Sequence, residues 1–335
     1  MKITMSHGSG GDATSKLIRE VFEKEFHNDY LGLMGDSAVL PGNGRIAFTT
    51  DSFVVKPLIF DGGDIGRLSV CGTVNDLLMS GADPKYLTAA FVLEEGLDTG
   101  LLKRIALSMR ETAEEAGVLI VSGDTKVIEH SGQKGEPGLI INTSGIGFLR
   151  EDTHISPERI EPGDVLILSG NLGDHHCAIL KERLNIKNDL IRSDNAPLCG
   201  MVRSLLRKGI EVHALRDVTR GGLGTVLNEF AAASGTGIVL EEKDLPVSSA
   251  VRSFSELLGL DILYMGNEGK LVCAVAPKDK DRALEIIKAA PYGENAVIIG
   301  FADEKTEDPR LILRTLIGGE RVVGPLYGEG LPRIC

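Results

Sequence analysis

The polar stretch REDTHISPERIEPGD, residues 150–164, divides this chain into two halves that each alternate strand-like and helix-like segments. It carries Pro157 and Pro162 and has no hydrophobic periodicity, which is typical of a linker between domains. A length of 335 residues also exceeds what one hydrophobic core usually serves. Since strands and helices are mixed on both sides of the linker, we expect an α+β fold with two domains rather than one doubly wound sheet.

Hydrophobic patterning predicts the elements of each half. Asp98 is a candidate N-cap for a helix that ends at Gly117. In the first half we predict strands at 44–55, 85–95, 118–127 (running into a loop) and 139–149, with helices at 64–82 and 98–117. In the second half we predict strands at 164–170, 270–276 and 295–302, with helices from about 174 and at 197–209, 223–235 and 281–290.

Charge and composition exclude several classes of protein. A net charge of -12 disfavours binding to nucleic acid or to an anionic membrane, and the absence of Trp makes base-stacking platforms unexpected. The chain contains no run of 18 apolar residues and no apolar region at its start. We therefore expect neither a membrane span nor secretion. The five cysteines are odd in number and form no CxxC pair, so a reducing cytoplasm fits better than a disulfide framework.

Two glycine-rich stretches are candidates for binding phosphate. GSGGDA at 8–13 fits the letters of a dinucleotide fingerprint, but no convincing buried strand precedes it, so we do not expect a Rossmann site. RDVTRGG at 216–222 offers the bidentate guanidinium of Arg220, and Gly221 and Gly222 expose backbone N–H groups at the start of a helix. An ordinary polar loop whose glycines begin the next helix would explain the same sequence.

Four aspartates beside small residues are candidate ligands for a nucleotide-bound metal. Magnesium prefers oxygen ligands and is usually shared between a few carboxylates and substrate phosphates. Ordinary turn and capping chemistry is the competing explanation for each aspartate taken alone. The four are Asp36, Asp51, Asp76 and Asp124.

Three further groups carry possible chemistry. Glu268 lies between glycines just before a predicted strand, where it could act as a general base, although the pattern alone favours a hairpin turn. His175, His176 and Cys177 are adjacent on a predicted helix and should point apart, so helix packing is favoured over a metal site. The chain ends on Cys335 after a glycine-rich segment, which could bring a thiol to a cleft.

Together these segments resemble the PurM-like ATP-binding superfamily of aminoimidazole ribonucleotide synthetase, selenophosphate synthetase and thiamine-monophosphate kinase. Within it, they are most similar to the HypE family of hydrogenase maturation proteins. The matching segments run along essentially the whole chain: SHGSGG, GDSAVL, TTDSFVVKPLIFDGGDIG, VCGTVNDLLMSGA, SGDTKV, RDVTRGGL, NEGKL and the final PRIC. The terminal cysteine distinguishes this family from its relatives.

The resemblance implies a PurM-like two-domain fold and a homodimer. The implied division is an ATP-binding and dimerisation domain at 1–150, a closing domain at 163–316 and a flexible tail at 317–335. ATP and Mg²⁺ are the implied cofactors. The resemblance assigns Asp36, Asp51, Asp76 and Asp124 to metal and phosphates, and Asn75, Thr219, Arg220, Gly221 and Gly222 to the nucleotide.

The resemblance also implies a reaction. Cys335 receives a carbamoyl group from the carbamoyltransferase HypF, and the protein dehydrates the resulting S-carboxamide to a thiocyanate with ATP. Lys126 and Glu268 match positions proposed to act in this step. The cyanide then passes to iron on a HypC-HypD scaffold for [NiFe]-hydrogenase. A PurM-like kinase or synthetase for a small metabolite and a non-catalytic nucleotide-binding scaffold remain the alternatives.

Overall fold

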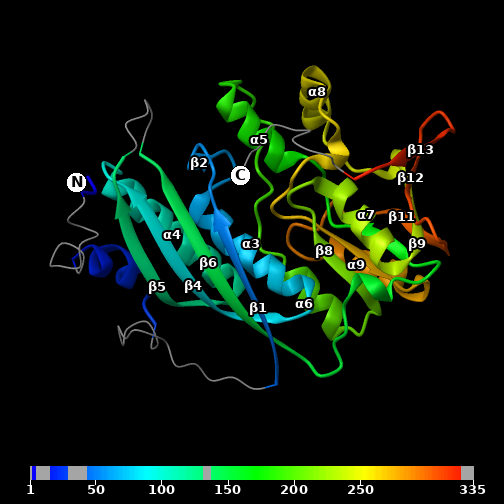
Figure 1. Ribbon diagram of the computed structural model, residues 1–335, viewed down its shortest axis with the longest axis horizontal. Coiled ribbons are helices and arrows are strands. Elements are labelled where there is room, and N and C mark those ends of the chain that lie inside the picture. The colour runs from blue at the N-terminus through cyan, green and yellow to red at the C-terminus, as the bar shows by residue number, and fades with distance from the viewer. Residues whose placement is uncertain (1, 5–15, 29–43, 131–136, 326–335) are drawn as a thin grey trace.

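The computed structural model describes residues 2–4, 16–28, 44–130 and 137–325, and two β-sheets dominate it (Figure 1). The first sheet has four strands in the order β1-β6-β4-β5. The second has seven in the order β13-β12-β9-β11-β7-β10-β8. Each predicted half of the chain thus forms its own mixed sheet, as an α+β fold requires.

In the four-stranded sheet, every neighbouring pair is antiparallel except β4 and β5. A parallel pair needs a crossover, which the helix α4 provides. Asp98 caps α4 by accepting hydrogen bonds from the N–H groups of Gly100 and Leu101, and Gly117 ends it in the left-handed conformation, as predicted. The strands are β1 (Arg45–Phe53), β4 (Asp83–Glu94), β5 (Leu119–Ile128) and β6 (Leu139–Leu149), and the helices are α3 (Ile65–Met79) and α4 (Thr99–Ala116).

Short elements flank this sheet. The π-helix η2 (Ile18–Glu23) leads into α2 (Lys24–Phe26), whose Phe26 is buried. A two-stranded sheet, β2 (Ile59–Phe60) with β3 (Gly63–Asp64), precedes α3.

The seven-stranded sheet takes its strands from far apart in the chain. Its strands are β7 (Val165–Leu168), β8 (Val212–Asp217), β9 (Thr236–Glu241), β10 (Leu271–Val275), β11 (Val297–Lys305), β12 (Leu311–Arg314) and β13 (Glu320–Val323). Its α-helices are α5 (Asp174–Arg183), α6 (Cys199–Arg207), α7 (Gly222–Ser234), α8 (Ser249–Leu258) and α9 (Lys280–Lys288). Single 3₁₀ turns are η4 (Pro157–Arg159), η5 (Glu242–Asp244), η6 (Ile262–Tyr264) and η7 (Pro277–Asp279).

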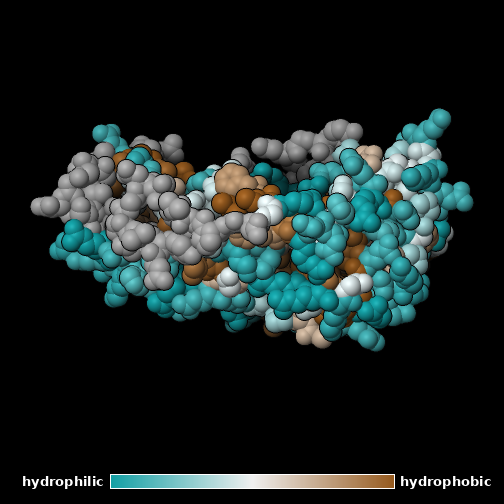
Figure 2. Space-filling view, turned by 90° about the horizontal axis from the view of Figure 1, so that it is seen from below, coloured by the Kyte–Doolittle hydropathy of each residue, from teal (hydrophilic) through white to brown (hydrophobic). Residues whose placement is uncertain are grey.

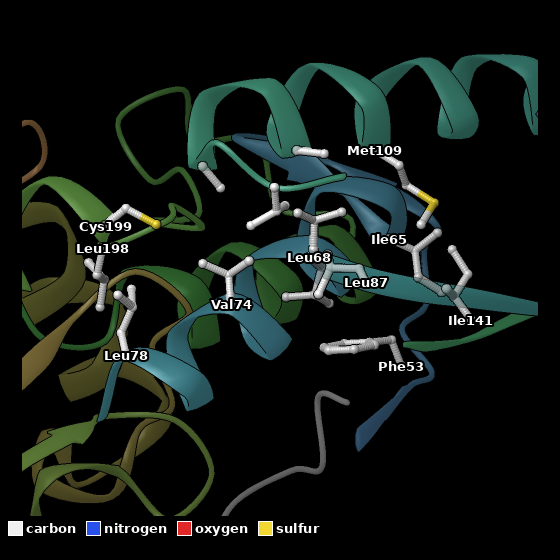
Figure 3. Close-up of a cluster of buried hydrophobic side chains, with 14 of the residues drawn as sticks. Phe53, Ile65, Leu68, Val74, Leu78, Leu87, Met109, Ile141, Leu198 and Cys199 are labelled. Atoms are coloured by element: carbon white, nitrogen blue, oxygen red, sulfur yellow. The ribbon is translucent and has the colours of Figure 1, made fainter. Parts of the chain in front are cut away.

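One hydrophobic core joins the two halves. Helix α3 is buried on almost every side, because it packs on the four-stranded sheet and also contacts β8 and α6 of the second half. Figure 3 shows Leu198 and Cys199 beside Val74 and Leu78 of α3 in this cluster. The relative position of the two sheets is therefore set by side-chain packing on α3.

Two expectations need correction. We predicted that 118–127 runs from strand into loop, whereas β5 continues as a strand to Ile128, because residues 122–128 pair in register with β4 after a shift at Val121. We also predicted a tail from residue 317, but Glu320–Val323 forms the edge strand β13. The β-branched Val322 and Val323 favour a strand there, and the surrounding glycines concealed this signal.

Candidate active site

Asp51 and Asp76 lie together between the first sheet and α3. Thr49, two residues before Asp51 on β1, donates a 3.1 Å hydrogen bond to Oδ2 of Asp76. Burial raises the pKa of Asp51, against the opposing effect of the Arg220 charge. Burial also raises the pKa of Asp76, and the neighbouring Asp51 charge adds to this. Two of the predicted aspartates are therefore close enough to repel each other.

The second half contributes two more carboxylates to the same place. Asp217 ends β8, and burial followed by the charge of Asp76 raises its pKa to about 7. Burial, followed by the charge of Asp217, raises the pKa of half-buried Glu268 well above its ordinary value. Asp51 acts on both groups. We call Asp51, Asp76, Asp217 and Glu268 the carboxylate cluster.

Backbone hydrogen bonds hold the loops of Asp217 and Glu268 side by side. The N–H of Val218 donates to the carbonyl of Lys270, and the N–H of Asn267 donates to the carbonyl of Val218, both at 2.9 Å. Glu268 lies in a loop between η6 and β10 and not in a hairpin turn. Asp217 was missing from the sequence-predicted site, although RDVTRGG contains it, because nothing local distinguishes it from an ordinary strand end.

The predicted phosphate loop leads directly into α7. Gly221 and Gly222 have φ of 84° and 64°, and α7 has no side-chain cap, so its first turn depends on other partners. A Cβ at Gly222 would lie 2.5 Å from the carbonyl oxygen of Leu263, which only glycine avoids. The Thr219 carbonyl accepts a 3.0 Å hydrogen bond from Gly222. Arg220 is exposed, and its charge lowers the pKa of both Asp51 and Glu268.

Asn75 has a different environment from the neighbouring Asp76. Its amide is buried, donates to the carbonyl of Ala196 at 3.1 Å and accepts from the N–H of Leu198 at 2.9 Å. These bonds connect α3 to the segment before α6. Its contact with a nucleotide stays a prediction.

Asp124 and Lys126 do not join the carboxylate cluster within one chain. Paired residues on neighbouring strands place their side chains on the same face of a sheet. Asp124 pairs with Ala90, Ala90 with Asn142 and Asn142 with Ser52, so Asp124 shares a face with Ser52 and not with Asp51. Lys126 forms an exposed 3.1 Å ion pair with Asp124 on that same face. Both residues are on β5, at the opposite edge of the sheet from β1.

The donor set of the cluster suits a divalent cation. All its side-chain donors are carboxylate oxygens, and a cation would relieve the repulsion that raises their pKa values. Within the described ranges, no three His, Cys, Asp or Glu side chains form a complete metal site. Asp36 and Cys335 lie outside the described residues.

The two adjacent histidines and the four internal cysteines are all buried. His175 and His176 are buried in α5, and the Nδ1 of His175 lies 2.7 Å from the hydroxyl of Ser193. Cys177, like Cys71, Cys199 and Cys273, is buried and free in a helix or strand. Burial raises the pKa of each of these thiols, which makes them poor nucleophiles.

A cleft of about 730 Å³ adjoins the Glu268 loop, because Asp194 in its lining accepts a 3.0 Å hydrogen bond from the N–H of Glu268. Arg67 crosses one wall and donates to the carbonyl of Asn195 at 2.9 Å and to the hydroxyl of Tyr292 at 3.2 Å. None of the sequence-predicted site residues that the structure describes lines this cleft.

Comparison with known proteins matches both halves of the chain. Residues 34–149 match the family AIR synthase related protein, N-terminal domain, and residues 161–311 match its C-terminal domain. The chain is 48% identical to carbamoyl dehydratase HypE of Cupriavidus necator, over all of this chain and 95% of that protein. It belongs to the HypE family. The corresponding Escherichia coli protein is 44% identical, over 99% of each chain.

Solved HypE structures have the same fold. A HypE crystal structure in complex with ATP gives a TM-score of 0.94 at 42% identity and covers 99% of both chains. The HypE chain of a HypE-HypF complex gives 0.80 at 46% identity, covering 92% of this chain and 99% of that one. Thiamine monophosphate kinase of Aquifex aeolicus is 17% identical with a TM-score of 0.62, which supports the fold alone. The predicted PurM-like α+β fold and the HypE resemblance are confirmed.

The helices in the described ranges are all too short or too polar to cross a membrane.

Proposed function

We propose that this HypE-family protein is a carbamoyl dehydratase: it uses ATP to convert an S-carboxamide on its own C-terminal cysteine to a thiocyanate. The observation that carries this proposal is the full-length similarity to carbamoyl dehydratase HypE proteins. The carboxylate cluster beside Arg220 is consistent with it, because both the nucleotide and the proton transfers need charged groups at one place. The cyanide made in this way serves the iron of [NiFe]-hydrogenase.

The segment RDVTRGG at 216–222, which we call the Arg220 loop, is the proposed phosphate site. A HypE relative with the same fold was crystallised with ATP. Arg220 would contact phosphate oxygens through its guanidinium, and Thr219, Gly221 and Gly222 would bring the nucleotide to the uncapped start of α7. Asn75 would lie beside the nucleotide, held in place by the hydrogen bonds of its amide to the backbone of Ala196 and Leu198.

Asp36, Asp51, Asp76 and Asp124 are the proposed ligands for Mg²⁺, and Asp217 is a further candidate. When bound, the cation would neutralise negative charge on the phosphates. The protein's own part is to hold deprotonated carboxylates close together despite the burial that raises their pKa values. Arg220 lowers this cost for Asp51.

The dehydration needs the amide oxygen to leave as phosphate. Transfer of the γ-phosphoryl group of ATP to the amide oxygen forms an O–P bond and releases ADP. The C–O bond then breaks with phosphate leaving, and the amide nitrogen loses its protons as the C≡N bond forms. Glu268 would accept a proton, which its raised pKa favours. Lys126 would stabilise charge on the departing phosphate.

A second copy of the chain would supply Lys126 and Asp124 to the site. These two residues lie on the opposite sheet face and the opposite edge strand from Asp51. That face also exposes large hydrophobic side chains, with Phe48 at 70% and Ile46 at 57% exposure. Figure 2 shows brown hydrophobic patches among the hydrophilic side chains of the surface. We therefore propose a homodimer through the outer face of the four-stranded sheet. Phe48→Asp should give monomers in light scattering, whereas Leu257→Asp on α8 should leave the dimer intact.

The remaining assignments complete the pathway of the carbamoyl group. HypF would donate it, in keeping with the known HypE-HypF complex of a relative. A HypC-HypD scaffold would receive the cyanide, and the reaction would take place in the cytoplasm. Residues 1–150 would bind nucleotide and dimerise, and residues 163–316 would close over the site.

Intact mass spectrometry tests the proposal. ATP should lower the mass of the carbamoylated protein by one water, and the change should map to Cys335. Cys335→Ser should bind ATP normally but never gain the carbamoyl mass. A mass change at Cys71, Cys177, Cys199 or Cys273 would contradict the mechanism. Turnover of a free metabolite without any carbamoyl group would favour the alternative, a PurM-like kinase or synthetase.

A further inference from the structure

Two side chains hold the backbone just after the last strand of the seven-stranded sheet. Strand β13 pairs with β12 up to Val323, whose side chain is buried in the core. Asn228 Nδ2 donates a 3.1 Å hydrogen bond to the carbonyl of Val323. The hydroxyl of Tyr264 donates a 2.7 Å hydrogen bond to the carbonyl of Gly324. We call Val323 and Gly324 the tail root, because the remaining residues lead from here to Cys335.

The two anchoring side chains come from two elements next to the Arg220 loop, α7 and η6. Asn228 is on α7, and its amide also donates to the carbonyl of Gly224 at 2.7 Å. The ring of Tyr264 lies against Gly224, where a Cβ would be 2.9 Å from Cε1 of the ring. A Cβ at Gly222 would lie 2.5 Å from the carbonyl carbon of Tyr264. The Arg220 loop, the start of α7 and the tail root are therefore packed as one unit.

The position of the tail root limits where the terminal Cys335 can reach. Cys335 is 335 − 324 = 11 residues beyond Gly324, so it can lie at most about 40 Å from the tail root. The effective concentration of a tethered group at a site depends on where the tether starts and on its length. Anchoring the tail root beside the Arg220 loop thus sets how often the terminal sulfur reaches the cluster.

We infer that Tyr264 and Asn228 are positioning residues for the dehydration, an inference that rests on the proposed function. They hold the tail root beside the Arg220 loop, so that Cys335 delivers its S-carboxamide to the carboxylate cluster within the molecule. Burial, followed by the charge of Asp261, raises the pKa of the Tyr264 phenol. Its hydroxyl therefore stays a hydrogen-bond donor throughout the neutral range.

Tyr264→Phe tests this role, because it keeps the ring against Gly224 and removes only the donor. We expect unchanged ATP affinity and unchanged carbamoylation, but single-turnover loss of water from the carbamoylated tail about two- to tenfold slower. Adding Asn228→Ala should slow it further. The control Tyr292→Phe removes a hydroxyl that binds Arg67 and Glu115 instead, and should keep the parental rate.

A reaction between separate molecules distinguishes positioning from damage to the site. Full-length Cys335→Ser protein has no carrier thiol, so it can be given a synthetic peptide of residues 325–335 with an S-carbamoylated cysteine. Tyr264→Phe in this background should convert the peptide as fast as its Cys335→Ser parent, because no tether is involved. Equal slowing with the peptide, or an unchanged rate within the molecule, would overturn the inference. Failure of the unmutated carbamoylated protein to lose water with ATP would instead overturn the proposed function, and the inference with it.

Discussion

Asp51 and Asp124 lie on opposite faces of the same four-stranded sheet. Strand pairing places Asp51 beside Thr143 and Ala89 on one face of the sheet. It places Asp124 beside Ala90 and Asn142 on the other face. Three strand spacings of about 4.8 Å, roughly 14 Å in all, also separate their strands. The proposed nucleotide site, which contains both carboxylates, therefore draws on two copies of the chain, and the first prediction below tests this proposal.

Mixed dimers test the shared site. In a heterodimer that combines an Asp51→Asn copy with a Lys126→Ala copy, one of the two sites would keep both native groups. We expect about half of the wild-type rate after purification through two different tags, although each homodimer is nearly inactive. An inactive heterodimer would contradict the shared arrangement.

Asp76→Asn should weaken Mg²⁺-dependent ATP binding by about tenfold or more, because it removes a carboxylate from the cluster. Titration calorimetry with and without Mg²⁺ measures this, and circular dichroism checks the fold. Asp308→Asn is the matched control, since that carboxylate is exposed and pairs with Arg310. The role of Asp76 would be refuted by an affinity equal to that of the control.

Glu268→Gln and Lys126→Ala should each bind ATP and accept the carbamoyl group, yet form thiocyanate about 10²- to 10⁴-fold more slowly. The glutamine amide cannot accept the proton, and the alanine methyl group cannot stabilise the phosphate charge. Quenched single-turnover reactions followed by mass spectrometry give the rates. Lys278→Ala removes an exposed lysine that pairs with Glu211 and should react normally. Wild-type rates in either test variant would exclude that residue from the chemistry.

His176→Leu should reduce the sensitivity of the fold to acid. Burial lowers the pKa of His176 to about 4, whereas an unfolded histidine titrates near 6.5. Between these values the unfolded state binds the extra proton, so stability is complete above pH 6.5 and falls as the pH drops towards 4. The loss amounts to at most about 3 kcal/mol.

Urea unfolding at several pH values between 4 and 7 measures this difference. The slope of stability with pH should be smaller in His176→Leu than in the wild type. His154→Leu, which removes an exposed histidine, should keep the wild-type slope. Identical slopes in all three proteins would show that His176 does not carry the effect.

Local sequence determined several elements because their signals are local. Asp98 and Gly117 mark the ends of α4, since a side-chain cap and a left-handed residue satisfy groups within one turn. The paired glycines likewise predicted the start of α7, because glycine adopts the positive φ seen at Gly221 and Gly222 without a steric cost. The family motifs predicted the PurM-like fold, because their order along the whole chain can be read directly from the sequence.

Only the tertiary structure decided the composition of the site. Asp217 was overlooked because β8 is a short strand with four buried residues in succession, and only its pairing with β10 brings its end beside Glu268. Asp124 was grouped with Asp51 because both are flanked by small and polar residues in the sequence. Strand order and register nevertheless place their side chains on different faces of the sheet. The contact of Tyr264 with Gly324 joins residues 60 positions apart. Local propensity determined where the elements form, whereas long-range packing on α3 and strand pairing determined which charges meet.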